Sequence, residues 1–195
     1  MKDEDILNYF KKSGALLEGH FILSSGFHSA MYLQCAKIFM DPKKSEYLCE
    51  ILANKIKENI NLDKIDIVLS PAIGGIIIGY VISKKINKKS IFLQRVEGTF
   101  TLRRGFKFSP GTRVLIIEDV ITTGKSSNEC ISYVEYHGGK VIGIACLVDR
   151  TSNFTFSKLG IISLLRLSIP IYSPNEIPDK LLEIKPIKPG SRGLT

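Results

Sequence analysis

Val114-Leu-Ile-Ile-Glu118-Asp119-Val-Ile-Thr122-Thr123-Gly124-Lys125-Ser126 is the stretch that decides the fold of this chain. Its branched apolar run is typical of a strand buried inside a parallel sheet. Two adjacent acids follow, and then a turn that leads into a helix expected over 127–137. Carboxylates at a strand end can bind a sugar diol or a hydrated cation, and the N–H groups at a helix start favour an anion. The stretch therefore predicts binding of a phosphorylated sugar.

Two other phosphate-binding patterns do not match this stretch. A P-loop would need glycine at position 119, where the chain has Asp119. A dinucleotide-binding fold has its glycines first and its acid later, whereas here the acids come first. Ordinary helix capping also explains Asp and Thr in such a turn, and on these residues alone it stays an open alternative.

The length of 195 residues favours one domain, 1–195. No apolar run reaches the roughly 18 residues that a transmembrane helix needs, and the acidic start Met1-Lys-Asp-Glu-Asp5 differs from a signal peptide. We therefore expect a cytoplasmic protein with no membrane partner. The four cysteines form no C-x-x-C pair and the three histidines are scattered. Buried thiols in a reducing compartment are expected rather than a zinc or redox site.

The net charge is +8, from 27 basic and 19 acidic residues. Such a charge is compatible with nucleic-acid binding. The lysines, however, are spread along the expected helices and loops, so a solvated surface and no nucleic-acid partner are the better interpretation. Arginines near the candidate site are more informative because polyanionic substrates need them. They are Arg95, Arg103, Arg104 and Arg113.

Strands and helices alternate along most of the chain. The apolar patterns predict strands over 65–69, 90–94, 113–118, 140–148 and 161–167, with helices between them. This order gives an α/β fold, a mainly parallel five-stranded sheet flanked by helices. Ligands bind such sheets beyond the carboxyl ends of the strands. That edge carries 70–75, Arg95, 118–126 and 149–150. Residues 1–40 predict a short helix and a hairpin, and 95–111 a long polar loop.

The acid pair followed by Thr-Thr-Gly-Lys-Ser resembles the phosphoribosyl-diphosphate (PRPP) signature of type I phosphoribosyltransferases. The resemblance implies that Glu118 and Asp119 hold the ribose hydroxyls and take part in catalysis. It implies that the following turn holds the 5-phosphate: Val120, Ile121, Thr122, Thr123, Gly124, Lys125 and Ser126. It also implies Mg²⁺ as cofactor, bound mainly through PRPP, with no protein ligand assigned.

Two further segments resemble parts of the same family. Residues 70–75 are similar to its diphosphate loop, which implies contacts from Ala72, Ile73 and Gly74. Residues 95–106 are similar to its mobile catalytic loop, which implies catalytic roles for Arg95, Arg103 and Arg104. In that family the loop closes onto the active site of the neighbouring subunit, so a homodimer with loop 95–111 acting across the interface is expected, and Arg95 is expected to contact PRPP.

The acceptor is indicated by two other segments. Residues 19–34 resemble the N-terminal hood of orotate phosphoribosyltransferases, which implies that Ser25, Gly26 and Tyr32 line the pocket for a flat heterocycle. An arginine at a strand end can grip a carboxylate at two points. By resemblance, Arg150 and the Thr122 hydroxyl bind the carboxylate of orotate, which uracil, adenine and hypoxanthine lack. Without the resemblance, residues 19–34 could be a plain hairpin, and Arg150 could form a structural ion pair.

The sequence departs from the family pattern where many members have lysine. The hood has Ser24, the diphosphate loop Gly74, and the mobile loop Arg103 and Arg104. Arginine does not release a proton near neutral pH, so it can neutralise the leaving diphosphate but cannot act as its acid. The prediction is transfer of the phosphoribosyl group from PRPP to N1 of orotate, in pyrimidine synthesis. The alternatives are a phosphoribosyltransferase for a purine or uracil, and a nucleic-acid-binding regulator with PRPP as effector.

Overall fold

The computed structural model describes residues 3–23, 25–151 and 159–189. The chain divides into two compact units, one comprising 1–38 and 168–195 and the other 39–167. Each unit is described by itself, and the expectation of a single domain stays a prediction. A short 3₁₀ helix, η1 (Cys35–Met40), contains the boundary between them. No helix in the described ranges combines the length and the apolar character needed to cross a membrane.

The larger unit is built on one six-stranded sheet with the order β5-β4-β3-β6-β7-β8. All neighbouring strands are parallel except β4 and β5, which confirms the predicted mainly parallel sheet; the sixth strand, β5, was not predicted. The strand bounds are β3 (Ile67–Pro71), β4 (Lys89–Val96), β5 (Thr99–Leu102), β6 (Arg113–Ile121), β7 (Lys140–Asp149) and β8 (Ile162–Arg166).

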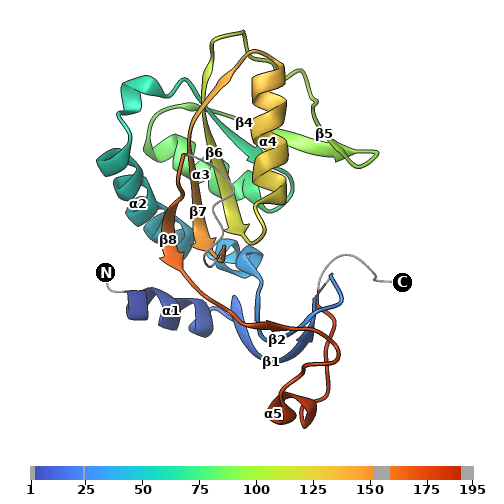
Figure 1. Ribbon diagram of the computed structural model, residues 1–195. Helices are drawn as coiled ribbons and strands as arrows, with labels where there is room; N and C mark the ends of the chain where they lie inside the picture. The colour runs from blue at the N-terminus through green and yellow to red at the C-terminus, as the bar shows by residue number, and fades with distance from the viewer. Residues whose placement is uncertain (1–2, 24, 152–158, 190–195) are drawn as a thin grey trace. The chain divides into compact units, whose positions relative to one another are not determined.

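Three helices cover this sheet: α2 (Pro42–Asn59), α3 (Gly75–Lys85) and α4 (Lys125–Tyr136). Helix α4 lies on one face, whereas α3 lies on the other beside α2 (Figure 1). Helix α2 begins at Pro42 because the Asp41 side chain caps it, accepting a hydrogen bond of 3.2 Å from the Lys44 N–H, and because proline is favoured in the first turn. A single 3₁₀ turn, η2 (Leu62–Lys64), connects α2 to β3.

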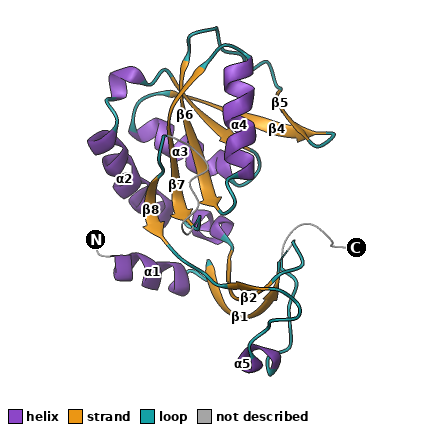
Figure 2. Ribbon diagram, in the orientation of Figure 1, coloured by secondary structure: helices purple, strands orange, loops and turns teal. Residues whose placement is uncertain are grey.

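The centre of the sheet is a topological switch point (Figure 2). From β3 the chain passes through α3 to β4 on one side, and from β6 it passes through α4 to β7 on the other. The loops that follow β3 and β6 therefore meet at one edge of the sheet, the place where α/β proteins bind ligands. The core of this arrangement is the fully buried run from Val114 to Ile117 in β6.

Helix α3 packs very close to the sheet because two of its residues lack side chains. A Cβ atom on Gly79 would lie 2.0 Å from the Ser70 hydroxyl oxygen, and one on Gly75 would lie 3.1 Å from the Ser70 Cβ. This contact holds the first turn of α3, and with it the loop after β3, against the end of β6. The glycines of this segment thus position the switch-point edge.

Part of segment 95–111, expected to be a loop, forms the outer β-hairpin. Glu97 and Gly98 connect β4 to β5 with φ values of 47° and 84°, as a type I′ turn requires. After β5, the Phe106 ring packs edge-on against Phe92 at 5.1 Å, and Phe108 packs against the core. Phe100, Leu102, Phe106 and Phe108 all pack on the core, which explains the difference. Arg103, Arg104 and Lys107, which lie between them, give the segment its polar character in the sequence. The predicted mobility of the segment stays a prediction.

The smaller unit contains α1 (Asp3–Lys12) and a three-stranded sheet with the order β1-β2-β9. Strands β1 (Leu16–Ile22) and β2 (His28–Leu33) form the predicted hairpin. The third strand, β9 (Ile171–Tyr172), was not predicted, because only two residues of the Pro-rich C-terminal part take part in it. The C-terminal part also forms one short helix, α5 (Asp179–Leu182).

Candidate active site

Two adjacent carboxylates lie near the carboxyl end of β6 at the switch point. Glu118 is buried, with 6% of its surface exposed, and its Oε1 accepts a hydrogen bond of 2.8 Å from the Ser127 hydroxyl on α4. Ser127 was missed by the sequence analysis, because nothing in a nine-residue separation indicates that a helix returns a hydroxyl to the strand before it. The carboxylate thereby has a fixed orientation relative to the first turn of α4.

Burial dominates the electrostatics of the pair. Desolvation raises the pKa of Glu118 to about 7, helped by the neighbouring charge of Asp119 and opposed by the hydrogen bond from Ser127. Desolvation also raises the pKa of Asp119, while the backbone N–H groups of Val120 and Asp119 act in the opposite direction. Both shifts indicate that the site favours a bound partner that supplies positive charge or hydrogen-bond donors.

The Asp119 carboxylate lies directly against the backbone of Gly74. A Cβ atom at position 74 would come within 2.6 Å of Asp119 Oδ2 and 2.9 Å of its Cγ. Gly74 has ordinary helical angles, φ −58° and ψ −38°, so the need for glycine comes from this close approach and not from backbone strain. The structure thus brings together the acid pair and the loop after β3, as their shared edge predicted.

The turn between β6 and α4 encloses a small cavity of about 60 Å³. Gly124 caps α4 with left-handed angles, φ 71° and ψ 5°, and the Lys125 N–H donates to Thr123 Oγ1 at 3.4 Å. The cavity has room for a group several times larger than one water molecule. Backbone N–H groups at a helix start and hydroxyl side chains are suited to an anion. It is lined by Glu118, Val120, Ile121, Thr122, Thr123, Gly124, Lys125, Ser126 and Ser127.

The loop after β3 carries the residues expected to contact diphosphate. The Ala72 N–H donates to the carbonyl of Leu93 at 2.7 Å, and the peptide bond between Ala72 and Ile73 is cis. The Ile73 side chain is 85% exposed. Ala72, Ile73 and Gly74 therefore lie at the same sheet edge as the acid pair.

Arg150 lies beside the turn, on the next strand. Ile121 pairs in register with Asp149, and the Arg150 N–H donates to the Ile121 carbonyl at 2.8 Å. Thr122 and Arg150 are therefore the first residues beyond two adjacent strand ends. Buried Asp149 fixes this corner, since it accepts hydrogen bonds from the Thr151 hydroxyl at 2.7 Å and from Arg166 Nε at 3.0 Å.

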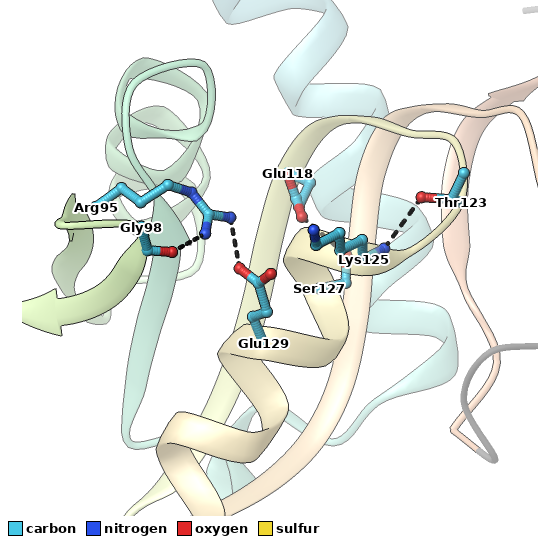
Figure 3. Close-up of polar contacts among 7 residues, drawn as sticks. All are labelled: Arg95, Gly98, Glu118, Thr123, Lys125, Ser127 and Glu129. Carbon is cyan, nitrogen blue, oxygen red and sulfur yellow. Dashed lines mark hydrogen bonds and ion pairs between the residues drawn. The ribbon is translucent and has the colours of Figure 1, made fainter. Parts of the chain in front are cut away.

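The arginines of the hairpin differ in their surroundings. Arg95 forms an ion pair with Glu129 on α4 and donates to the Gly98 carbonyl at 2.6 Å (Figure 3). Arg103 and Arg104 follow β5 and are exposed, and Arg104 Nε donates to Gln94 Oε1 at 3.1 Å. The register pairs Leu102 with Leu93, so these two arginines lie at the base of the hairpin, whereas its tip is the turn after Val96. Glu129 has no sequence signal because its partner is 34 residues away.

The hood residues belong to the smaller unit and are described within it. Ser25 and Gly26 form the exposed turn between β1 and β2. The Tyr32 hydroxyl donates to Gln34 Oε1 at 3.1 Å, and its ring centroid is 5.7 Å from that of Phe21. Ser24, which replaces the usual lysine, lies outside the described residues. The role of these residues toward a heterocycle stays a prediction.

The carboxylates also offer hard oxygen donors for a cation. Within the described parts of the chain, no group of three or more His, Cys, Asp and Glu side chains could hold a metal ion. Glu118 and Asp119 alone supply too few ligands for a closed Mg²⁺ site, but carboxylates combined with substrate phosphates are a common Mg²⁺ environment. The donor set fits an ion that arrives with a phosphorylated substrate.

Comparison with known proteins identifies relatives across the whole chain. Residues 39–158 match the family model described as phosphoribosyl transferase domain. The chain is 48% identical to an orotate phosphoribosyltransferase of Methylorubrum extorquens, over 100% of this chain and 98% of the relative. It is 45% identical to an orotate phosphoribosyltransferase of Parvibaculum lavamentivorans, over 98% of each chain.

Solved structures share the fold. The crystal structure of orotate phosphoribosyltransferase from Aeropyrum pernix matches with a TM-score of 0.68 at 24% identity, covering 82% of this chain and 92% of that one. The Mycobacterium tuberculosis orotate phosphoribosyltransferase in complex with inorganic phosphate matches with a TM-score of 0.65 at 21% identity, covering 85% and 96%. At these identities the match confirms the α/β fold predicted above.

The buried Glu118 makes the stability of the ligand-free protein depend on pH. Its folded-state pKa of about 7 lies above the ordinary 4.5, so the unfolded chain loses this proton first. Stability that Glu118 contributes in its protonated form is therefore lost as the pH rises from 4.5 through about 7. We expect the free energy of unfolding of Glu118→Gln to exceed that of the parent by roughly 3 kcal/mol at pH 8, and to be close to it near pH 5.

Urea unfolding at several pH values measures this difference. Glu135→Gln on the exposed face of α4 is the matched control, and it should keep the pH dependence of the parent protein. Parallel stability curves for Glu118→Gln and the parent would contradict the proposed burial effect.

Proposed function

The chain belongs to the orotate phosphoribosyltransferase family, and on that premise we propose that the edge formed by Glu118, Asp119 and the turn 120–127 is its PRPP site. The enzyme transfers the 5-phosphoribosyl group from PRPP to N1 of orotate, giving orotidine 5′-monophosphate and diphosphate in pyrimidine synthesis. The bond from ribose C1 to the diphosphate oxygen breaks, the bond from C1 to N1 forms, and N1 of orotate gives up its proton. Positive charge develops on the ribose between these events.

The single observation that supports this site is the acid pair, buried Glu118 and half-buried Asp119, next to the small cavity of the turn. The backbone N–H groups and hydroxyls of the turn hold the 5-phosphate, and the acids accept hydrogen bonds from the ribose hydroxyls. Because these contacts fix both ends of the ribose, they orient C1 for attack, and the negative acids stabilise positive charge on the sugar. Ala72, Ile73 and Gly74 take the diphosphate.

Mg²⁺ is the proposed cofactor, held by Glu118 and Asp119 together with PRPP oxygens. When bound, it supplies positive charge that stabilises the leaving diphosphate. The hard oxygen donors and the raised pKa values of both acids favour a cation at this place.

Arg150 and Thr122 bind the orotate carboxylate. They follow neighbouring strand ends that are joined by the hydrogen bond from the Arg150 N–H to Ile121, so both lie beside the phosphate turn. A guanidinium can form two parallel hydrogen bonds with a planar carboxylate, which selects orotate over bases that lack one. From the family resemblance, we propose that Ser25, Gly26 and Tyr32 of the smaller unit contact the heterocycle.

A homodimer completes the active site, with the hairpin of one subunit acting on the other. Three large apolar side chains in and just before α3 are exposed: Ile73 at 85%, Ile77 at 49% and Tyr80 at 63%. Ile77 and Tyr80 are three residues apart and lie on one side of the helix, Ile73 belongs to the loop before it, and exposed apolar groups of this kind are typical of protein interfaces. Arg95 contacts the diphosphate of the neighbouring site, and Arg103 and Arg104 add positive charge there. The four buried cysteines suit a reducing, cytoplasmic location.

Asp119→Asn should lower kcat by roughly 100-fold, because it removes a charge that acts on the ribose in the transition state. Its stability should equal or exceed that of the parent, since desolvation of the half-buried carboxylate raises its pKa. Absorbance of orotate measures turnover, and Asp63→Asn, an exposed acid outside the site, is the control. Gly74→Ala should also lower kcat, because its Cβ would displace the intact Asp119 side chain. Unchanged turnover in both variants would exclude the assigned role.

Arg150→Ala should raise the KM for orotate at least about tenfold, with a smaller change in the KM for PRPP. The physical reason is that the Arg150 guanidinium is the one positively charged group proposed to bind the orotate carboxylate. Steady-state kinetics with each substrate varied gives both constants. Arg166→Ala removes a neighbouring arginine that binds Asp149 and should change the two constants equally. Equal effects of Arg150→Ala would indicate a structural role.

Mixing two inactive variants tests the action of Arg95 across the dimer. Arg95→Ala and Asp119→Asn should each be nearly inactive alone. After subunit exchange at a 1:1 ratio, half of the dimers are mixed and contain one intact site, so about a quarter of the parent activity should return. Native mass spectrometry verifies that mixed dimers form. Mixed dimers without recovered activity would show that Arg95 serves its own subunit.

A further inference from the structure

Helix α4 holds both strands of the hairpin through residues one helical turn apart. Glu129 forms the ion pair with Arg95 on β4, and the Tyr133 hydroxyl accepts a hydrogen bond of 3.2 Å from the Leu102 N–H on β5. Residues four apart lie on the same face of a helix. The same helix begins at the phosphate turn with Lys125. One rigid element thus connects the phosphate turn to the hairpin.

The Arg95 guanidinium is held by three contacts, two of which are drawn in Figure 3. Glu129 binds Nη2, the Gly98 carbonyl accepts from Nη1 at 2.6 Å, and Cζ lies 4.1 Å from the centre of the Phe100 ring. Phe100 pairs in register with Arg95 on the facing strand. Since a guanidinium has more N–H donors than these contacts use, the arrangement leaves donors for an anion.

The residues that fix Arg95 also line a groove of about 860 Å³ between the hairpin and α4. The groove extends to Thr123 and Lys125 of the phosphate turn. A partly exposed ion pair of this kind contributes little to stability, and the side chains of Arg95 and Glu129 are 32% and 31% exposed. We therefore infer that holding the Arg95 side chain in one rotamer serves binding or catalysis. A side chain that is already oriented loses less conformational entropy when the substrate binds.

We propose that Glu129 is a positioning residue for the transfer reaction, which orients Arg95 from α4 so that its remaining donors meet the leaving diphosphate. This inference rests on the proposed function, because it assumes that Arg95 contacts diphosphate. Helix α4 therefore has two roles: its first turn contributes to the 5-phosphate site of its own subunit, and its Glu129 orients the Arg95 that acts on the neighbouring subunit. Glu129 itself touches no substrate.

A double-mutant cycle tests the proposal. Glu129→Gln keeps the size and a hydrogen-bond acceptor but removes the charge, and should lower kcat/KM for PRPP about tenfold while the KM for orotate changes less than about twofold. In an Arg95→Ala background the same substitution should have no further effect, because nothing is left to position. Glu135→Gln, which removes the same charge from the exposed side of α4, is the control and should behave as the parent in both backgrounds.

Mixed dimers give a second readout that a merely structural role would not produce. If Glu129 acts through Arg95, Glu129→Gln should complement Asp119→Asn but should not complement Arg95→Ala. Urea unfolding should show equal stability for Glu129→Gln and the parent, and Glu129→Asp, which keeps the charge, should recover part of the activity.

The outcomes separate the two proposals. Parent-like activity of Arg95→Ala would overturn the role of Arg95 and with it the premise. A strong loss in Arg95→Ala combined with parent-like activity of Glu129→Gln would overturn the positioning role alone. The positioning role would also be overturned if the activity loss in the double variant Arg95→Ala/Glu129→Gln equalled the product of the two single losses, since Glu129 would then act independently of Arg95.

Discussion

The desolvation of two adjacent carboxylates near the end of β6, buried Glu118 and half-buried Asp119, is the constraint on which the rest of the larger unit depends. Removing like charges from water is unfavourable, and the raised pKa values of Glu118 and Asp119 express this cost. The fold keeps the pair because each acid has a defined environment: the Ser127 hydroxyl orients Glu118, and the backbone of Gly74 leaves space for Asp119. A substrate that brings hydroxyl donors and a cation compensates the two carboxylates for the hydration that they lose in the folded protein.

Close packing at the switch point follows from the same constraint. The acid pair can meet the loop after β3 only if the start of α3 approaches the sheet, and Gly75 and Gly79 permit this approach against Ser70. The left-handed Gly124 then turns the chain so that α4 begins immediately beyond the acids. Gly75, Gly79 and Gly124 thus help to place backbone N–H groups and carboxylates around the same small cavity.

The sequence was sufficient for the features that depend on local pattern. The strand ending in Glu118 and Asp119, the turn after it and the alternation of strands and helices follow from periodicity and turn chemistry, and the shared sheet edge follows from topology. Contacts between distant residues were not accessible in this way. The strand around Phe100 is only four residues long and gives little periodic signal. The partners of Glu118 and Arg95 depend on how α4 packs, which no spacing in the sequence encodes.

The glycine at position 74 links these observations to the chemistry of diphosphate release. Many members of the family have a lysine at the matching place, but here the Asp119 carboxylate occupies the space that a Cβ would need. The loop after β3 therefore contributes backbone groups and no cation, and the positive charge for the leaving group has to come from elsewhere. The hairpin carries Arg95, Arg103 and Arg104, and within the described residues Arg95 is the one that α4 holds in place through an ion pair. An arginine cannot deliver a proton near neutral pH, so its contribution depends on placement, and placement is what Glu129 provides.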